Sequence, residues 1–265
     1  MLCFRAQSVD LGSDNNMNNK TSIATWLSLS VAAWIWAGIV GCASHGDPRD
    51  PIEPFNRSMQ KFNDTLDDYV MKPIAQGYRW VTPDFVDDGV SNFFNNLGDI
   101  AVTVNDLLQF KFAHGGQDAA RLVVNTTVGA GGLIDVASRL GLERHEEDFG
   151  QTLAVWGVPN GPYLVLPFLG PMTPRDAVGN VADGFLNPIS YTVLPARVGL
   201  YGLKTVDLRA DNLKATEVLD EAALDRYSFI RNAYFQRREY LVYDGEPPLR
   251  EEEFEEFEKE LEESE

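Results

Sequence analysis

An apolar run that ends in Gly41-Cys42 sets where the folded part of this chain can begin. The run covers residues 23–40 and follows a short polar stretch that contains Lys20. A basic segment, an apolar segment and a small residue, in that order, are typical of a secretory signal peptide. A cysteine directly after the small residue indicates a lipobox, in which the thiol is acylated and the chain is cut before it. We therefore expect residues 1–41 to be removed, which leaves Cys42 as a lipid-anchored first residue.

Two other interpretations of this leader stay open. A transmembrane anchor needs about 20 apolar residues, and residues 23–40 approach that length, although hydroxyl-bearing side chains dilute them. A cleaved secretory signal with an incidental cysteine is the second alternative. Asp10 and Asp14 suit a basic leader poorly, so residues 1–16 are interpreted as an upstream extension of the true start. Ala43 stands where an aspartate would tend to retain a lipoprotein at the inner membrane, and it therefore favours the outer membrane.

The composition excludes several functional classes. The formal net charge is −18, which disfavours nucleic-acid binding because phosphate neutralisation needs a basic surface. Of the two cysteines, Cys3 lies before the cut and Cys42 is acylated, so no thiol remains for a disulfide, a metal site or a nucleophile. The three histidines, His45, His114 and His145, lack metal-ligand spacing and are interpreted as surface residues. We expect no cofactor and no metal.

The sequence contains no recognisable catalytic motif. It has no G-x-S-x-G nucleophile elbow, no P-loop and no G-x-G-x-x-G fingerprint. The glycines of residues 129–132 follow no predicted strand, so we interpret them as a junction between helices. The acidic run Glu146-Glu147-Asp148 could support general acid–base chemistry, but a solvated helix start is the interpretation that we favour. We predict that the protein is not an enzyme and has no catalytic residues.

Apolar residues recur at three- and four-residue intervals along the body, which predicts an all-α fold of many short helices. Thr173 and Pro174 are typical of a helix N-terminus. Pro73, Gly98 and the pair Gly115-Gly116 are interpreted as helix ends. Residues 204–240 form the longest periodic segment and predict one long C-terminal helix. The other helices are expected over residues 53–71, 84–97, 100–112, 117–127, 133–140, 146–156, 174–184 and 192–201.

The segment 157–171 is apolar but rich in proline and glycine, which excludes a continuous helix. Within it, residues 163–166 could form a short extended segment. An apolar and rigid loop must either be buried or meet lipid, since its exposure would create a hydrophobic patch. The candidate residues for a membrane interface or rim are Trp156, Tyr163, Phe168 and Leu169.

Short motifs follow one another in a distinctive order between residues 50 and 240. They include Asp50-Pro-Ile-Glu-Pro-Phe-Asn-Arg57, Asn125-Thr-Thr127, Glu147-Asp-Phe-Gly-Gln-Thr-Leu153, Gly161-Pro-Tyr163, Leu166-Pro-Phe168 and Tyr234-Phe-Gln-Arg237. In these motifs the chain resembles the MlaA (VacJ) family of Gram-negative outer-membrane lipoproteins. The resemblance covers nearly the whole body and agrees with the lipobox.

The resemblance implies a fold and a function. The fold is a ring of short amphipathic helices in the outer membrane around a central amphipathic channel. The function is removal of mislocalised phospholipids from the outer leaflet, which maintains the lipid asymmetry of the outer membrane. The implied partners are phospholipid, a trimeric porin and a soluble periplasmic lipid-carrier protein. A lipid passage needs no catalytic residue, so the absence of catalytic motifs is compatible with this function.

The resemblance also suggests site residues. The first-helix motif is the candidate for the lipid channel or for the helix that borders it, while the alternative is a helix start packed on the core. Its residues are Phe55, Asn56, Arg57, Phe62 and Asn63.

We expect a signal peptide over residues 1–41, a tether over 42–52, a helical domain over 53–243 and an acidic, disordered tail over 244–265. Two other functions stay open. One is a structural or assembly lipoprotein that binds porins without moving lipid. The other is a lipid hydrolase that uses the acidic run at residues 146–148.

Overall fold

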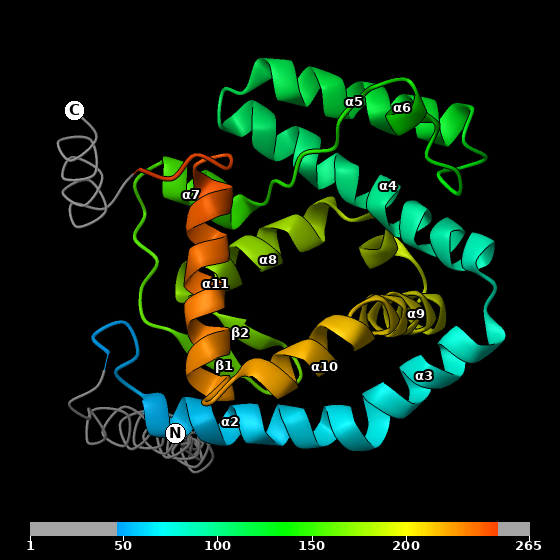
Figure 1. The fold of residues 1–265 in the computed structure, drawn as a ribbon. Helices are drawn as coiled ribbons and strands as arrows, with labels where there is room; N and C mark the ends of the chain where they lie inside the picture. Colours follow the sequence, from blue (N-terminus) through cyan, green and yellow to red (C-terminus); the bar gives the residue numbers. More distant parts are fainter. Residues whose placement is uncertain (1–46, 249–265) are drawn as a thin grey trace, which may run out of the picture.

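The computed structural model describes residues 47–248 of the chain (Figure 1). The predictions for the signal peptide, for acylation of Cys42 and for residues 249–265 therefore lie outside the described residues. The first residues of the expected tail belong to the folded body, because Asp244 forms an ion pair with Lys111.

The first helical part of the described residues is a bent rod (Figure 1). It consists of α2 (Glu53–Leu66), a π-helical segment (Asp67–Met71) and α3 (Lys72–Val81). The prediction that Pro73 ends the helix was wrong. A proline inside a regular α-helix clashes with the carbonyl one turn earlier. Here the wider π turn precedes it, and the Lys72 N–H bonds to the carbonyl of Asp67. The proline therefore bends the rod instead of ending it.

The next two helices form an antiparallel hairpin. They are α4 (Asp84–Leu108) and α5 (Phe112–Thr127). Gly98 lies within α4 and Gly115-Gly116 within α5, so the helix ends predicted at these glycines were wrong. An interior glycine costs about 1 kcal/mol, which tertiary packing can offset. A Cβ atom at Gly115 would lie 3.1 Å from the Cβ of Asp106, so this glycine allows α5 to pack closely on α4.

The middle of the chain contains short elements. The tight turn at Ala130–Gly132 has positive φ at each residue. It leads to α6 (Val136–Arg139), and α7 (Phe149–Val155) follows. The structure also contains a small antiparallel sheet, which the prediction of an all-α fold did not include. Strand β1 (Leu164–Leu166) pairs with β2 (Gly170–Met172), and Leu164 lies opposite Met172.

The helix α8 (Pro174–Leu186) begins as predicted, since the hydroxyl of Thr173 accepts a hydrogen bond from the Asp176 N–H at 3.3 Å. A 3₁₀ turn (Pro188–Tyr191) follows it.

The predicted long C-terminal helix is wrong. The segment contains α9 (Leu194–Asp211), α10 (Leu213–Ala222) and α11 (Arg226–Val242). At the first break, the Asn212 side chain donates to the Leu208 carbonyl at 2.7 Å. At the second, the Asp225 carboxylate caps α11 by accepting from the Tyr227 N–H. The breaks turn the chain, so that α11 runs from the α2 side of the molecule to the α7 side (Figure 1).

Many side chains are placed opposite to the usual pattern of a water-soluble protein. Large apolar residues such as Trp80 (87% exposed) and Phe85 (77%) lie on the surface. Polar residues such as Asn56, Asn105 and Asp118 are completely buried. Buried polar groups and large exposed apolar groups are both informative departures. Within residues 47–248, no helix is long and apolar enough to cross a membrane. The distribution of exposed apolar side chains indicates that part of the surface faces apolar surroundings.

Candidate functional site: a central amphipathic cavity

The helices surround a cavity of about 830 Å³. Its wall combines four helices, α4, α8, α9 and α11, with the segment before α7 (residues 140–148). Figure 1 shows these helices around the middle of the molecule. Leu169, in the turn between β1 and β2, reaches the same cavity. The apolar lining includes Leu97, Val102, Leu169, Leu208 and Leu241, and the charged lining includes Arg144, Glu146, Asp148, Asp183, Lys204, Arg237 and Arg238. The cavity can therefore accommodate a molecule with both charged and apolar parts.

Most acidic groups in this wall already have partners. Arg237 pairs with Glu146 at 2.7 Å, and Arg238 bonds to both oxygens of Asp148, at 2.5 and 3.0 Å. These pairs bring α11 against the segment before α7. Burial raises the pKa of the Asp183 carboxyl, which accepts bonds from Asn105 and from the Phe149 N–H. The acidic side chains of the wall thus mainly hold the elements together.

The acidic run at residues 146–148 is not a solvated helix start. Glu147 is buried and bonds to Lys111 and Gln109 through its two carboxylate oxygens. Asp148 caps α7 through the Gln151 N–H, in addition to its bonds to Arg238. Each of the three carboxylates forms an ion pair with a cationic side chain. The run is therefore not arranged as a pair of carboxyl groups available for general acid–base catalysis.

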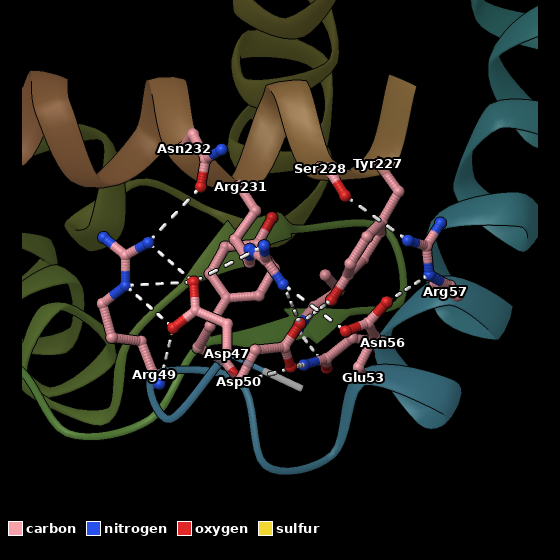
Figure 2. Close-up of polar contacts among 12 residues, drawn as sticks. Asp47, Arg49, Asp50, Glu53, Asn56, Arg57, Tyr227, Ser228, Arg231 and Asn232 are labelled. Carbon is pink, nitrogen blue, oxygen red and sulfur yellow. Dashed lines mark hydrogen bonds and ion pairs between the residues drawn. The ribbon is translucent and has the colours of Figure 1, made fainter. Parts of the chain in front are cut away.

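A polar cluster closes the ring of helices by joining α11 to the start of the body (Figure 2). The carboxylate of Asp50 accepts hydrogen bonds from Asn56 (2.8 Å), from Arg231 (3.2 Å) and from the Tyr227 hydroxyl. Arg57 contacts both oxygens of Asp225, at 3.1 and 2.7 Å, and lies 4.3 Å from the centre of the Tyr227 ring. These contacts attach α11 to α2 and to the segment before it.

Two asparagines of α2 hold the β hairpin by its backbone. Asn56 donates to the Tyr163 carbonyl and accepts from the Val165 N–H, both at 2.9 Å. Asn63 repeats this pattern further along, with the Leu166 carbonyl and the Phe168 N–H, also at 2.9 Å. The two amides therefore fix the strand β1 against α2, and the turn that follows places Leu169 in the cavity.

The predicted first-helix residues are brought together, but none of them lines the central cavity. Asn56, Asn63 and Arg57 hold the hairpin and α11, as described above. Phe62 packs against Phe168 with ring centres 5.5 Å apart, while Phe55 is largely exposed. The motif thus positions parts of the cavity wall, and sequence reasoning did not find the partners that it contacts.

The predicted interface residues divide into two groups. Trp156, Phe168 (73% exposed) and Leu169 (69%) are exposed, as an interface would require, although Leu169 also lines the open central cavity. Tyr163 is fully buried, so its prediction as an interface residue was wrong. Alternate residues of an extended segment point to opposite sides, and Tyr163 and Val165 both point into the core against Phe235 and Tyr227.

A second buried cluster lies between α4, α5 and the segment before α7. His145 was interpreted as a surface residue, but its Nδ1 lies 2.7 Å from the buried Asp118 carboxylate, and its ring stacks on His114 at 4.0 Å. Asp106 nearby is completely buried, and neither of its carboxylate oxygens has a partner among the described residues. Burial, followed by the neighbouring charges of Glu147 and Asp118, raises the pKa of Asp106 to about 7.

This pKa predicts a dependence of stability on pH. The folded state binds the Asp106 proton more tightly than the unfolded state, so stability should fall as pH rises from about 4 to about 7. Asp106→Asn should remove part of the difference in unfolding free energy between pH 5 and pH 8, as measured by urea titration. The exposed Asp88→Asn is the control and should leave that difference unchanged. An equal pH dependence in the Asp106→Asn protein would contradict the assignment.

The body contains an amphipathic cavity, buries polar groups and exposes apolar side chains. These features are typical of a class of helical, membrane-associated proteins that bind lipid. The sequence comparison is specific within that class. The family model described as MlaA lipoprotein matches residues 48–241, and the chain belongs to this family.

Characterised relatives agree with this assignment. The intermembrane phospholipid transport system lipoprotein MlaA of Escherichia coli K12 is 40% identical over 83% of this chain and 90% of its own length. The protein of the same description from Haemophilus influenzae is 34% identical over 86% of this chain and 93% of its own length. A solved structure from work on the maintenance of bacterial outer-membrane lipid asymmetry matches with a TM-score of 0.67 and 37% identity. That match covers 73% of this chain and 98% of the solved chain.

Proposed function

We propose that this chain is the outer-membrane lipoprotein of an intermembrane phospholipid transport system. It removes mislocalised phospholipids from the outer leaflet through the central cavity and so maintains the lipid asymmetry of the membrane. The observation that carries the proposal is the amphipathic cavity of about 830 Å³, which is lined by helices that also expose large apolar side chains. The relatives described as phospholipid transport lipoproteins support it.

The exposed apolar side chains suggest how the body lies in the membrane. Trp80 and Phe85 project from the junction of α3 and α4, and Val178, Val181 and Phe185 form an apolar surface groove on α8. Side chains of this kind favour insertion into the interfacial and hydrocarbon regions of a bilayer. Cys42 precedes the first described residue by a short segment, so acylation there would hold α2 close to the membrane.

A soluble periplasmic lipid carrier and a trimeric porin are the proposed protein partners. The carrier would receive the phospholipid, and the porin would hold the lipoprotein in the membrane. The alternative function is a structural or assembly lipoprotein that binds porins and moves no lipid. Phospholipid that copurifies within the body would argue against this alternative.

Deletion of the gene tests the proposed function. Cells that lack this chain should expose more phospholipid to an externally added phospholipase and should become more sensitive to detergent. Expression of the wild-type chain should reverse both changes. Unchanged outer-leaflet phospholipid in the deletion strain would refute the proposed function.

A further inference from the structure

Lys204 differs from the other cations that line the central cavity. It lies on α9 and is half-buried, and no carboxylate within residues 47–248 forms an ion pair with its ammonium group. Burial, followed by the positive charge of Arg144, lowers the pKa of Lys204. A half-buried cation that faces another cation is unfavourable for folding. The Lys204 ammonium group forms no hydrogen bond with residues 47–248, so a role in stabilising the fold does not explain its position.

Arg144 lines the same cavity, and its guanidinium has few hydrogen-bond partners. Its Nε bonds to the buried Asp99 carboxylate at 3.2 Å, and its terminal nitrogens have no hydrogen bond to any described residue. Gly98 lies beside it on α4, and a Cβ atom at that position would approach a terminal nitrogen of Arg144 to 3.9 Å. Gly98 therefore places no side chain against this end of the guanidinium, and Arg144 itself lines the cavity.

We propose that Lys204 and Arg144 form an anion subsite that binds the phosphate group of a phospholipid inside the central cavity. The inference rests on the proposed function and specifies where the headgroup binds. An ammonium group and an open guanidinium edge suit the oxygens of a phosphodiester. Leu97 and Leu208 line the same cavity and provide apolar surface for the acyl chains. Since every phospholipid carries this phosphate, the subsite should not discriminate between headgroups.

The subsite is tested by photo-crosslinking in cells with radiolabelled phospholipid. A photoreactive residue replaces Leu208, which lies one helical turn from Lys204 on the cavity wall. We expect labelled lipid to crosslink to the otherwise wild-type chain. Lys204→Gln should reduce this crosslinking by roughly tenfold, the effect of losing one hydrogen bond to a charged group. Lys204→Arg should retain most of it.

Lys214 provides the matched control, because it is an exposed lysine on α10 that lies outside the cavity lining. Lys214→Gln should crosslink like the wild type. Lys204→Gln should melt at a temperature no lower than the wild type, because no described hydrogen bond or ion pair is lost. This result separates a binding role from a structural one.

The outcomes distinguish the subsite from the proposed function and from binding of free phosphate. Absence of lipid crosslinking in the wild type would count against the proposed function itself. Strong crosslinking that is equal in the wild type and in Lys204→Gln would overturn the subsite while the function stands. If millimolar inorganic phosphate raises the melting temperature of the wild type but not of Lys204→Gln, and lipid crosslinking is equal in both, the site binds free phosphate and the lipid assignment is wrong.

Discussion

Gly179→Ala should lower the free energy of unfolding by about 3 kcal/mol, because α7 and α8 touch through the backbones of two glycines. A Cβ atom at Gly179 would lie 2.4 Å from the backbone nitrogen of Gly150 and 2.8 Å from its Cα. Neither atom belongs to a flexible side chain, so the two helices must move apart. The separation would also displace Asp148 and Asp183, which line the central cavity.

Gly199→Ala is the matched control for this prediction. Gly199 lies within α9, and nothing approaches within 4 Å of the position its Cβ would take. Alanine should therefore stabilise the protein by about 0.5–1 kcal/mol through its higher helix propensity. Urea unfolding followed by circular dichroism of the detergent-solubilised protein measures both changes. Equal stability of the two variants would contradict the close contact between α7 and α8.

Asn56→Leu should destabilise the protein by about 4 kcal/mol. The substitution removes three buried hydrogen bonds, to the Asp50 carboxylate, the Tyr163 carbonyl and the Val165 N–H. Each buried group that loses its partner costs about 1–3 kcal/mol. Leucine has the same number of side-chain heavy atoms as asparagine but is bulkier, so overpacking at this fully buried position adds to the loss.

Asn63→Leu removes the equivalent pair of bonds at the open end of the same strand. The Phe168 N–H there is exposed, so water can replace its partner, and the expected loss is only about 1 kcal/mol. The same unfolding measurement compares the two variants. A smaller loss for Asn56→Leu than for Asn63→Leu would show that Asn56 does not anchor the hairpin.

The sequence predicted local features of the fold better than long-range ones. The start of α8 was predicted correctly from Thr173 and Pro174, because a helix cap depends on residues that are adjacent in sequence. The break assigned to Pro73 failed, since a π turn accommodates the ring. The break at Gly115 failed because the glycine serves contact with another helix. Both corrections depend on tertiary structure, which periodicity does not report.

Periodicity also does not show which face of a helix points inward. On α8, Val178 and Val181 are exposed, whereas Asp176 is buried against α11, where Arg238 and Tyr234 bond to it. An apolar stripe in a water-soluble protein would predict the opposite orientation. The resemblance to a membrane lipoprotein family was therefore needed to anticipate this arrangement.

The candidate site was only partly predictable for a related reason. The motif residues Asn56 and Arg57 were recognised in sequence, but their partners Val165 and Asp225 lie far along the chain. Lys204 resembles any lysine on the polar face of a helix. Its lack of a carboxylate partner becomes visible only when the surrounding helices are in place.

Passage of lipid through the central cavity is the central claim, and outer-leaflet phospholipid in the deletion strain tests it most directly. The strain should express the wild type, Ala101→Trp or Ala182→Trp, each at equal level and with confirmed folding. Ala101 lines the cavity, and Ala182 lies in the apolar surface groove on α8. We predict that the wild type and Ala182→Trp restore low outer-leaflet phospholipid, while Ala101→Trp, which fills the cavity, leaves it high. Full restoration by Ala101→Trp would contradict passage through this cavity.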